Sequence, residues 1–268
     1  MRAVVLRVAG VLVPVLVLGA CASGGRPVPP PSLGAPASSP SPSAPSLDAP
    51  GPAPSPTRDP ADVVSAARDA TQRAGSVVVT RTAQDGEDWT HEDIEVAFTV
   101  PPSARVLHVG DDIWTLNVVD GVGHLKDQSE RKSTNRWTRL DDTETAARLR
   151  GLSPEGLLGV LGAATSVAAP TEETVREVPS TCHAFVLDPV EALTLAETDI
   201  GAEPGDTPSP SPTPTGAATA RLCADGQERP VELVVTLGGQ VTTSVFSQWG
   251  FAIEALPPPE HLVDQPGG

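Results

Sequence analysis

The clearest pattern in the chain is an alternation of apolar and polar positions between residues 94 and 100. Ile94, Val96, Phe98 and Val100 are each separated by one polar or small residue, and two prolines follow. A period of two is typical of a strand with one covered face, and proline ends such a strand. Shorter segments predict further strands at 77–82, 106–109, 114–118, 136–140, 175–178, 183–187, 231–237, 241–246 and 251–255.

Helical patterns precede and interrupt these strands. Asp59 and Pro60 provide a helix start, because Asp caps free amide groups and Pro fits the first turn. Apolar residues then recur every three or four positions up to Gly75, which is expected to end the helix. Two more helical pieces are expected at 143–150 and from Ser153 onward. A helix, a run of strands, a helical excursion and more strands predict an α+β fold with a large antiparallel sheet.

The first twenty residues have the pattern of an export signal. Arg2 and Arg7 form a basic start, and the apolar run Val8–Leu18 has 11 residues, too few to cross a bilayer. Small residues then lead to Cys21, an arrangement that resembles the bacterial lipobox. This resemblance implies a signal peptide at 1–20, a diacylglyceryl group on Cys21 and anchoring at the extracytoplasmic face of the membrane. The alternative is an ordinary secretory signal followed by a chance cysteine.

Two segments have compositions that do not support a packed core. Twelve of the 37 residues in 22–58 are Pro, and most others are Ser, Ala or Gly. We therefore expect residues 21–58 to form a disordered, extended tether. A similar stretch at about 198–218 is expected to be a disordered insertion, with Ser/Thr-Pro sites that O-glycosylation can use. One domain is expected at 59–263, followed by a disordered tail at 264–268.

Charge and composition exclude several functions. There are 18 basic and 34 acidic side chains, a net charge of −16, and loss of the signal would leave −18. Nucleic-acid binding is not expected, because it needs a basic surface. Only eight residues are aromatic, and none of them is Tyr.

Catalytic patterns are missing from the sequence. The five His residues show no metal-ligand spacing, and neither a Gly-x-Ser-x-Gly turn nor a Gly-rich phosphate loop occurs. We expect no enzyme activity, no metal and no cofactor. Neighbouring acidic pairs such as Asp111 and Asp112 are expected to serve turns and helix caps.

Cys182 and Cys223 remain as an even pair once Cys21 carries lipid. In an oxidising, exported location such a pair favours a structural disulfide that brackets the proline-rich insertion. Two free thiols, as a metal or redox pair, are the alternative.

Several motifs resemble one family in their order along the chain. They are the lipobox, the Pro/Ser tether, the first helix, the strand at 94–100, Val106–Trp114, Trp137–Leu140, Leu152–Leu158 and Phe246–Gly250. Together they resemble the actinobacterial LppX/LprA/LprF/LprG-type lipoproteins, whose fold is similar to that of the LolA/LolB carriers. The resemblance implies a curved antiparallel half-barrel closed by helices, with an apolar cavity that carries or presents lipid or glycolipid acyl chains. The proline-rich insertion, the Cys pair and the absence of Tyr depart from the general pattern.

Two functions follow from this resemblance. The first is a monomeric, membrane-anchored lipoprotein with a lipid or glycolipid ligand. Its candidate cavity residues are Ile94, Val96, Phe98, Trp114, Leu116, Val118, Val231, Leu233 and Val235. The second is a non-catalytic envelope scaffold of the same fold without a ligand. A cavity and a packed core use the same residue types, so the sequence leaves both open.

Overall fold

The structure is a computed structural model that describes residues 58–128, 135–197 and 216–264. The expected signal peptide, Cys21, the tether up to residue 57, insertion residues 198–215 and tail residues 265–268 lie outside the described residues. The helices are α1 (Pro60–Ala74), α2 (Asp142–Leu152), α3 (Pro154–Leu157) and α4 (Pro189–Glu197), with 3-10 turns η1 (Gly159–Ala163) and η2 (Glu260–Leu262).

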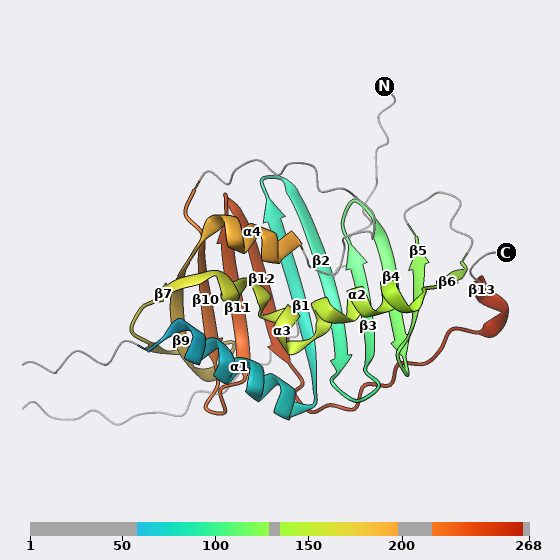
Figure 1. The fold of residues 1–268 in the computed structure, drawn as a ribbon, viewed down its shortest axis with the longest axis horizontal. Coiled ribbons are helices and arrows are strands. Elements are labelled where there is room, and N and C mark those ends of the chain that lie inside the picture. Colours follow the sequence, from blue (N-terminus) through green and yellow to red (C-terminus); the bar gives the residue numbers. More distant parts are fainter. Residues whose placement is uncertain (1–57, 129–134, 198–215, 265–268) are drawn as a thin grey trace, which may run out of the picture. The chain divides into compact units, whose positions relative to one another are not determined.

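The strands form one curved sheet (Figure 1). From one edge to the other, hydrogen-bonded neighbours follow the order β13-β6-β5-β4-β3-β2-β1-β12-β11-β10-β9-β7, and β8 also pairs with β9. All neighbours are antiparallel except β13 and β6. The strands are β1 (Ser76–Asp85), β2 (Asp88–Ala97), β3 (Ser103–Val109), β4 (Ile113–Val119), β5 (Val122–Asp127), β6 (Trp137–Arg139), β7 (Ala164–Val167), β8 (Thr171–Val175), β9 (Val178–Leu187), β10 (Thr219–Ala224), β11 (Pro230–Leu237), β12 (Gln240–Ser247) and β13 (Val263–Asp264). The predicted α+β class with a curved, mostly antiparallel sheet is confirmed.

Local capping explains where the helices begin and end. The Asp59 carboxylate accepts a hydrogen bond from the Ala61 amide at 2.9 Å, and Gly75 ends α1 in a left-handed conformation that glycine adopts without steric cost. The Ser153 hydroxyl accepts from the Gly156 amide at 3.1 Å and so begins α3. The helix starts expected at Asp59 and Ser153 are confirmed.

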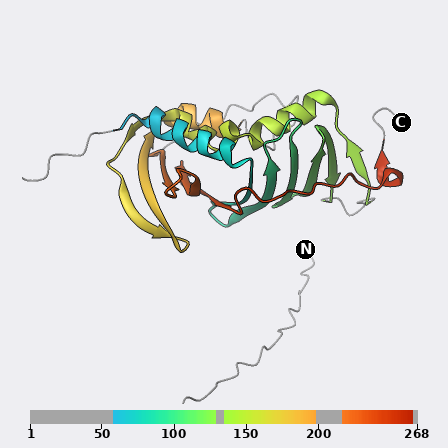
Figure 2. The same cartoon turned by 90° about the horizontal axis from the view of Figure 1, so that it is seen from below.

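The helices lie together on one face of the sheet (Figure 2). Buried residues of α1, α2, α3, η1 and α4 join buried residues of the strands in a single apolar cluster. This cluster is the core of the domain, and none of the helices in the described residues lies on the opposite face of the sheet.

Several local predictions differ from the structure. The strand expected at 94–100 ends at Ala97 in β2, and strand β7 was not anticipated. The strand expected at 175–178 is interrupted by a turn at Arg176 and Glu177, both with positive φ, which separates β8 from β9. Strand β10 and helix α4 were not anticipated, since they border the proline-rich insertion. Residues 251–255 form no strand, because β12 already pairs with β1 and β11 and the chain then turns across the strand ends.

Candidate functional site: the helix-covered face of the sheet

Strand register aligns the side chains that face the helices into rows across the sheet. One row consists of Val77, Val96, Ala104 and Val118, which are partners across β1, β2, β3 and β4. The next row towards the other ends of these strands is also apolar; it contains Phe246, Val79, Ile94, Val106 and Leu116. All of these side chains are buried, so the two rows form a continuous apolar surface beneath the helices.

Eight of the nine candidate cavity residues lie on or beside this surface. Ile94, Val96, Leu116, Val118, Leu233 and Val235 belong to the main core cluster, and Phe98 and Trp114 are partly buried against it. Val231 instead packs with the two cysteines in a second small cluster. The pairing of β10 and β11 shifts register between Cys223 and Ala224, which separates this end of β11 from the main cluster.

The six core members among these candidates are only 0–7% exposed. A space wide enough for water would leave them more exposed, so other side chains close directly over them. An acyl chain would therefore have to separate a helix from the sheet to reach this surface. The role of all nine residues as a ligand lining remains a prediction.

The third row of the same face is charged. Arg81, Glu92 and His108 are partners across β1, β2 and β3. The Glu92 carboxylate lies 3.3 Å from Arg81 Nη1 and 3.1 Å from His108 Nδ1. Burial by itself would raise the pKa of Glu92, but the His108 hydrogen bond and the Arg81 charge hold that pKa below its usual value. The apolar surface thus ends at a charged row in which the Glu92 carboxylate is paired with Arg81 and His108.

An aromatic contact extends this row towards the helices. The rings of His108 and Trp114 are stacked with centroids 4.8 Å apart, and the guanidinium of Arg148 in α2 lies 5.5 Å from the Trp114 centroid. Cation–π attraction of this kind holds a buried arginine over an indole face. Trp114, predicted as a cavity residue, therefore packs between a strand histidine and a helix arginine.

A cavity of about 520 Å³ lies on the helix-free face, along β7, β9, β10 and β11. Its lining includes Ala184, Val186, Thr219, Arg221 and Val234. None of these five lining residues was among the candidates predicted from the sequence. Val186 and Val234, apolar at outward positions, were the available signal.

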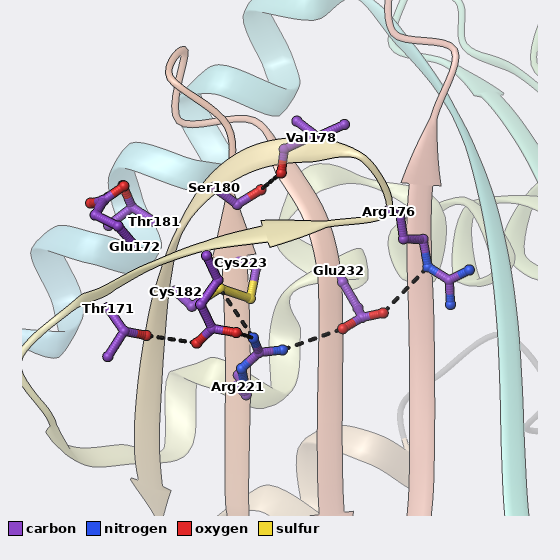
Figure 3. Close-up of a disulfide and its surroundings, with 11 residues drawn as sticks. Thr171, Glu172, Arg176, Val178, Ser180, Thr181, Cys182, Arg221, Cys223 and Glu232 are labelled. Carbon is purple, nitrogen blue, oxygen red and sulfur yellow. Dashed lines mark hydrogen bonds and ion pairs between the residues drawn. A yellow bond between two sulfur atoms is a disulfide. The ribbon is translucent and has the colours of Figure 1, made fainter. Parts of the chain in front are cut away.

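Cys182 and Cys223 form a disulfide between directly opposite residues of β9 and β10 (Figure 3). Both residues are buried. Arg221 lies beside the bond, with its guanidinium 3.3 Å from Cys182 Sγ, and pairs with Glu173 of β8 and Glu232 of β11. The ion pairs connect three strands around the cross-link, which favours a structural role over reactive thiols.

Within 58–128, 135–197 and 216–264, no group of three or more His, Cys, Asp or Glu residues is placed to hold a metal ion. None of the helices in these ranges is long and apolar enough to cross a membrane.

Comparison with known proteins shows the fold. No family model matches the sequence, and no curated protein matches it. Among solved structures, Mycobacterium tuberculosis lipoprotein LppX is similar with a TM-score of 0.50 and 17% identity, covering 74% of this chain and 100% of LppX. LprF from Mycobacterium bovis has a TM-score of 0.49 and 12% identity over 75% of this chain and 99% of its own. The LppX-type fold implied by the motifs is therefore confirmed.

Proposed function

We propose that this protein is a non-catalytic envelope lipoprotein, anchored through a diacylglyceryl group on Cys21, that binds lipid or glycolipid acyl chains between its helices and its sheet. The observation that carries the proposal is the two-row apolar surface beneath the helices. The helical layer over this surface is divided into α1, α2, α3, η1 and α4, and its middle part is made of short segments, since α3 has four residues and η1 five. Short segments joined by loops can move apart more readily than one long helix.

The charged row fits an amphiphilic ligand. An acyl chain inserted beneath the helices would lie along the apolar rows, while the row of Arg81, Glu92 and His108 would face its polar end. Lipid extraction followed by mass spectrometry of the purified protein tests the proposal directly. We expect an acyl-containing compound at near one equivalent, in addition to the anchor on Cys21. Protein that never carries such a compound would contradict lipid carriage.

A scaffold without a ligand is the second candidate. The near-complete burial of Ile94, Leu116 and Val118 favours it, because these side chains already have neighbours on every side. Both candidates share the anchor and the fold, and they differ only in whether the helices separate from the sheet.

Val96→Trp separates the two functions. If the helices part to admit an acyl chain, the indole takes up that space; co-purifying lipid is lost, and the free energy of unfolding changes by less than about 1 kcal/mol. If the interior cannot open, the same change overpacks it and costs about 1–3 kcal/mol or more. We expect the first result, measured by mass spectrometry and urea unfolding.

Asp93→Trp is the matched control for this experiment. Asp93 lies in the same strand and is exposed on the opposite face. The substitution Asp93→Trp adds the same ring without filling the interior, so the amount of co-purifying lipid should not change. A strongly destabilised Val96→Trp, together with a wild type free of lipid, would leave the scaffold as the function.

Cys21→Ser should release the protein from the membrane fraction. The substitution removes the thiol that the acyl group requires, and none of the helices in the described part of the chain can replace the anchor. Fractionation followed by repeated washes in excess buffer measures the effect, because dilution removes any weak, reversible membrane contact of the unanchored domain; Cys182 and Cys223 are left intact. A variant that stays in the washed membranes would show that the anchor lies elsewhere.

A further inference from the structure

The C-terminal segment 248–259, here called the strap, runs along one edge of the sheet. In Figures 1 and 2 it follows the ends of β1 to β5 from β12 to β13. Two hydrogen bonds fix its backbone: the Ser76 hydroxyl donates to the Phe251 carbonyl at 2.7 Å, and the Asn117 side-chain amide donates to the Leu256 carbonyl at 2.9 Å. At its far end β13 pairs with β6. The strap is thus held at both ends and in its middle.

Three apolar side chains project into solvent along this edge. Phe251 and Leu256 of the strap are 59% and 71% exposed, and Val100 is 99% exposed. Val100 lies in the loop between β2 and β3, three residues beyond Ala97, whose strand partner is Ser76. Val100 therefore lies at the same end of the strands as the hydrogen bond between Ser76 and Phe251. We call Val100, Phe251 and Leu256 the apolar rim.

The backbone that carries two of the three rim residues is held in place. Single exposed apolar residues are ordinary, but several gathered at one edge mark a surface that another apolar phase covers. The Phe251 and Leu256 carbonyls are both hydrogen-bonded, so the backbone at these two positions is held against the sheet while their side chains lie in solvent. Water-facing apolar groups held in this way are ready to enter an apolar phase at little ordering cost.

We propose that the apolar rim inserts into the surface of a phospholipid bilayer and so orients the tethered domain on its own membrane. The expected anchor at Cys21 is separated from α1 by 38 residues, which reach about 120 Å as an extended polyproline chain. That distance keeps the domain near the bilayer at high effective concentration. A weak insertion then suffices to hold the rim at the membrane.

Charge selects the kind of bilayer. Glu254 lies between Phe251 and Leu256 in the strap, and Asp120 occupies the nearby turn between β4 and β5; both are exposed. The whole chain has a net charge of −16. The exposed Arg105, the strand partner of Asn117, is a single cation against these two carboxylates and makes no basic patch for anionic headgroups. With the net negative charge of the chain, the rim is suited to lipids without net charge. Binding should come from apolar insertion, and salt should not abolish it.

Vesicle flotation of the full chain carrying Cys21→Ser tests the rim without the anchor. The assay uses a high lipid concentration, which replaces the high effective concentration that the anchor provides. Under this condition we expect the protein to float with phosphatidylcholine vesicles, and to bind at least tenfold less when Phe251→Ser and Leu256→Ser are added. Replacing part of the lipid with phosphatidylglycerol should weaken binding at low salt, and 0.5 M salt should restore it. Failure of the Cys21→Ser chain to float would overturn the proposal.

The matched control replaces two exposed apolar residues at the opposite ends of the strands. Trp89→Ser and Val241→Ser change residues that are 59% and 40% exposed, and both are expected to leave flotation unchanged. Equal binding of rim and control variants would overturn the proposal. So would a rim variant that alters sedimentation of the protein alone while still floating, because the rim would then join two copies. The rim variant should still contain its co-purifying lipid. A loss of flotation with that lipid retained therefore reports on the rim and not on the proposed internal ligand.

Discussion

Phe185→Ala should lower the free energy of unfolding by about 3–5 kcal/mol. Phe185 is the bulkiest of the fully buried side chains in the described ranges, and it faces the helices from β9. Its strand partners are Val167 of β7 and Ala220 of β10, and all three belong to the main core cluster. Small neighbours such as Ala220 cannot expand to fill the space of a lost ring, so most of the cavity should remain.

Val186→Ala provides the comparison within the same strand. Val186 points to the helix-free face and is 53% exposed, so its truncation should cost less than about 1 kcal/mol. Urea unfolding of both variants, followed by circular dichroism, measures the difference. A Phe185→Ala variant that loses no more stability than Val186→Ala would show that the interior beneath β9 is loose enough to collapse, and would favour an adaptable ligand space over a packed core.

Removal of the disulfide by Cys182→Ala and Cys223→Ala together should cost about 4 kcal/mol. The bond joins residues 41 positions apart, and a cross-link of that span restricts the unfolded chain by about this amount. Both cysteines are buried beside Val175 and Val231, so two alanines leave an apolar site without an unpaired thiol. The loss should appear as a lower urea midpoint.

Reduction of the wild type is the corresponding control. A reducing agent strong enough to open the buried bond should lower the stability of the wild type to that of the double variant, and should not affect the double variant itself. If the double variant loses less than 1 kcal/mol, the ion pairs of Arg221 with Glu173 and Glu232 already hold β8, β10 and β11 together, and the cross-link adds little.

Fold class and element types were largely readable from local signals. The alternation at 94–100 gave β2 its two faces, and Asp59, Pro60 and Gly75 located both ends of α1. The order of short motifs indicated the LppX-type fold even though identity to LppX is only 17%. Such signals are readable because capping and periodicity depend on residues within a few positions of one another.

The candidate site was readable only in part. Alternation identified Ile94, Val96, Leu116 and Val118 as one-sided residues, but not whether helices or a ligand would cover them. The placement of Val231 beside the disulfide depends on the register shift in β10, which no local pattern reveals. The cavity on the helix-free face likewise depends on the curvature of four strands.

By itself, then, the sequence indicated the α+β class, the first helix and the disulfide between the two remaining cysteines, all of which the structure contains; export and anchoring at Cys21 remain predictions from the sequence. Only the tertiary structure decided which strands are neighbours, how the charged row of Arg81, Glu92 and His108 ends the apolar surface, and that residues 251–255 cross the strand ends. These features arise from contacts between distant positions, such as Asn117 with Leu256, 139 residues apart. Local propensity fixes the faces of each element, whereas register and packing between remote segments decide what each face meets.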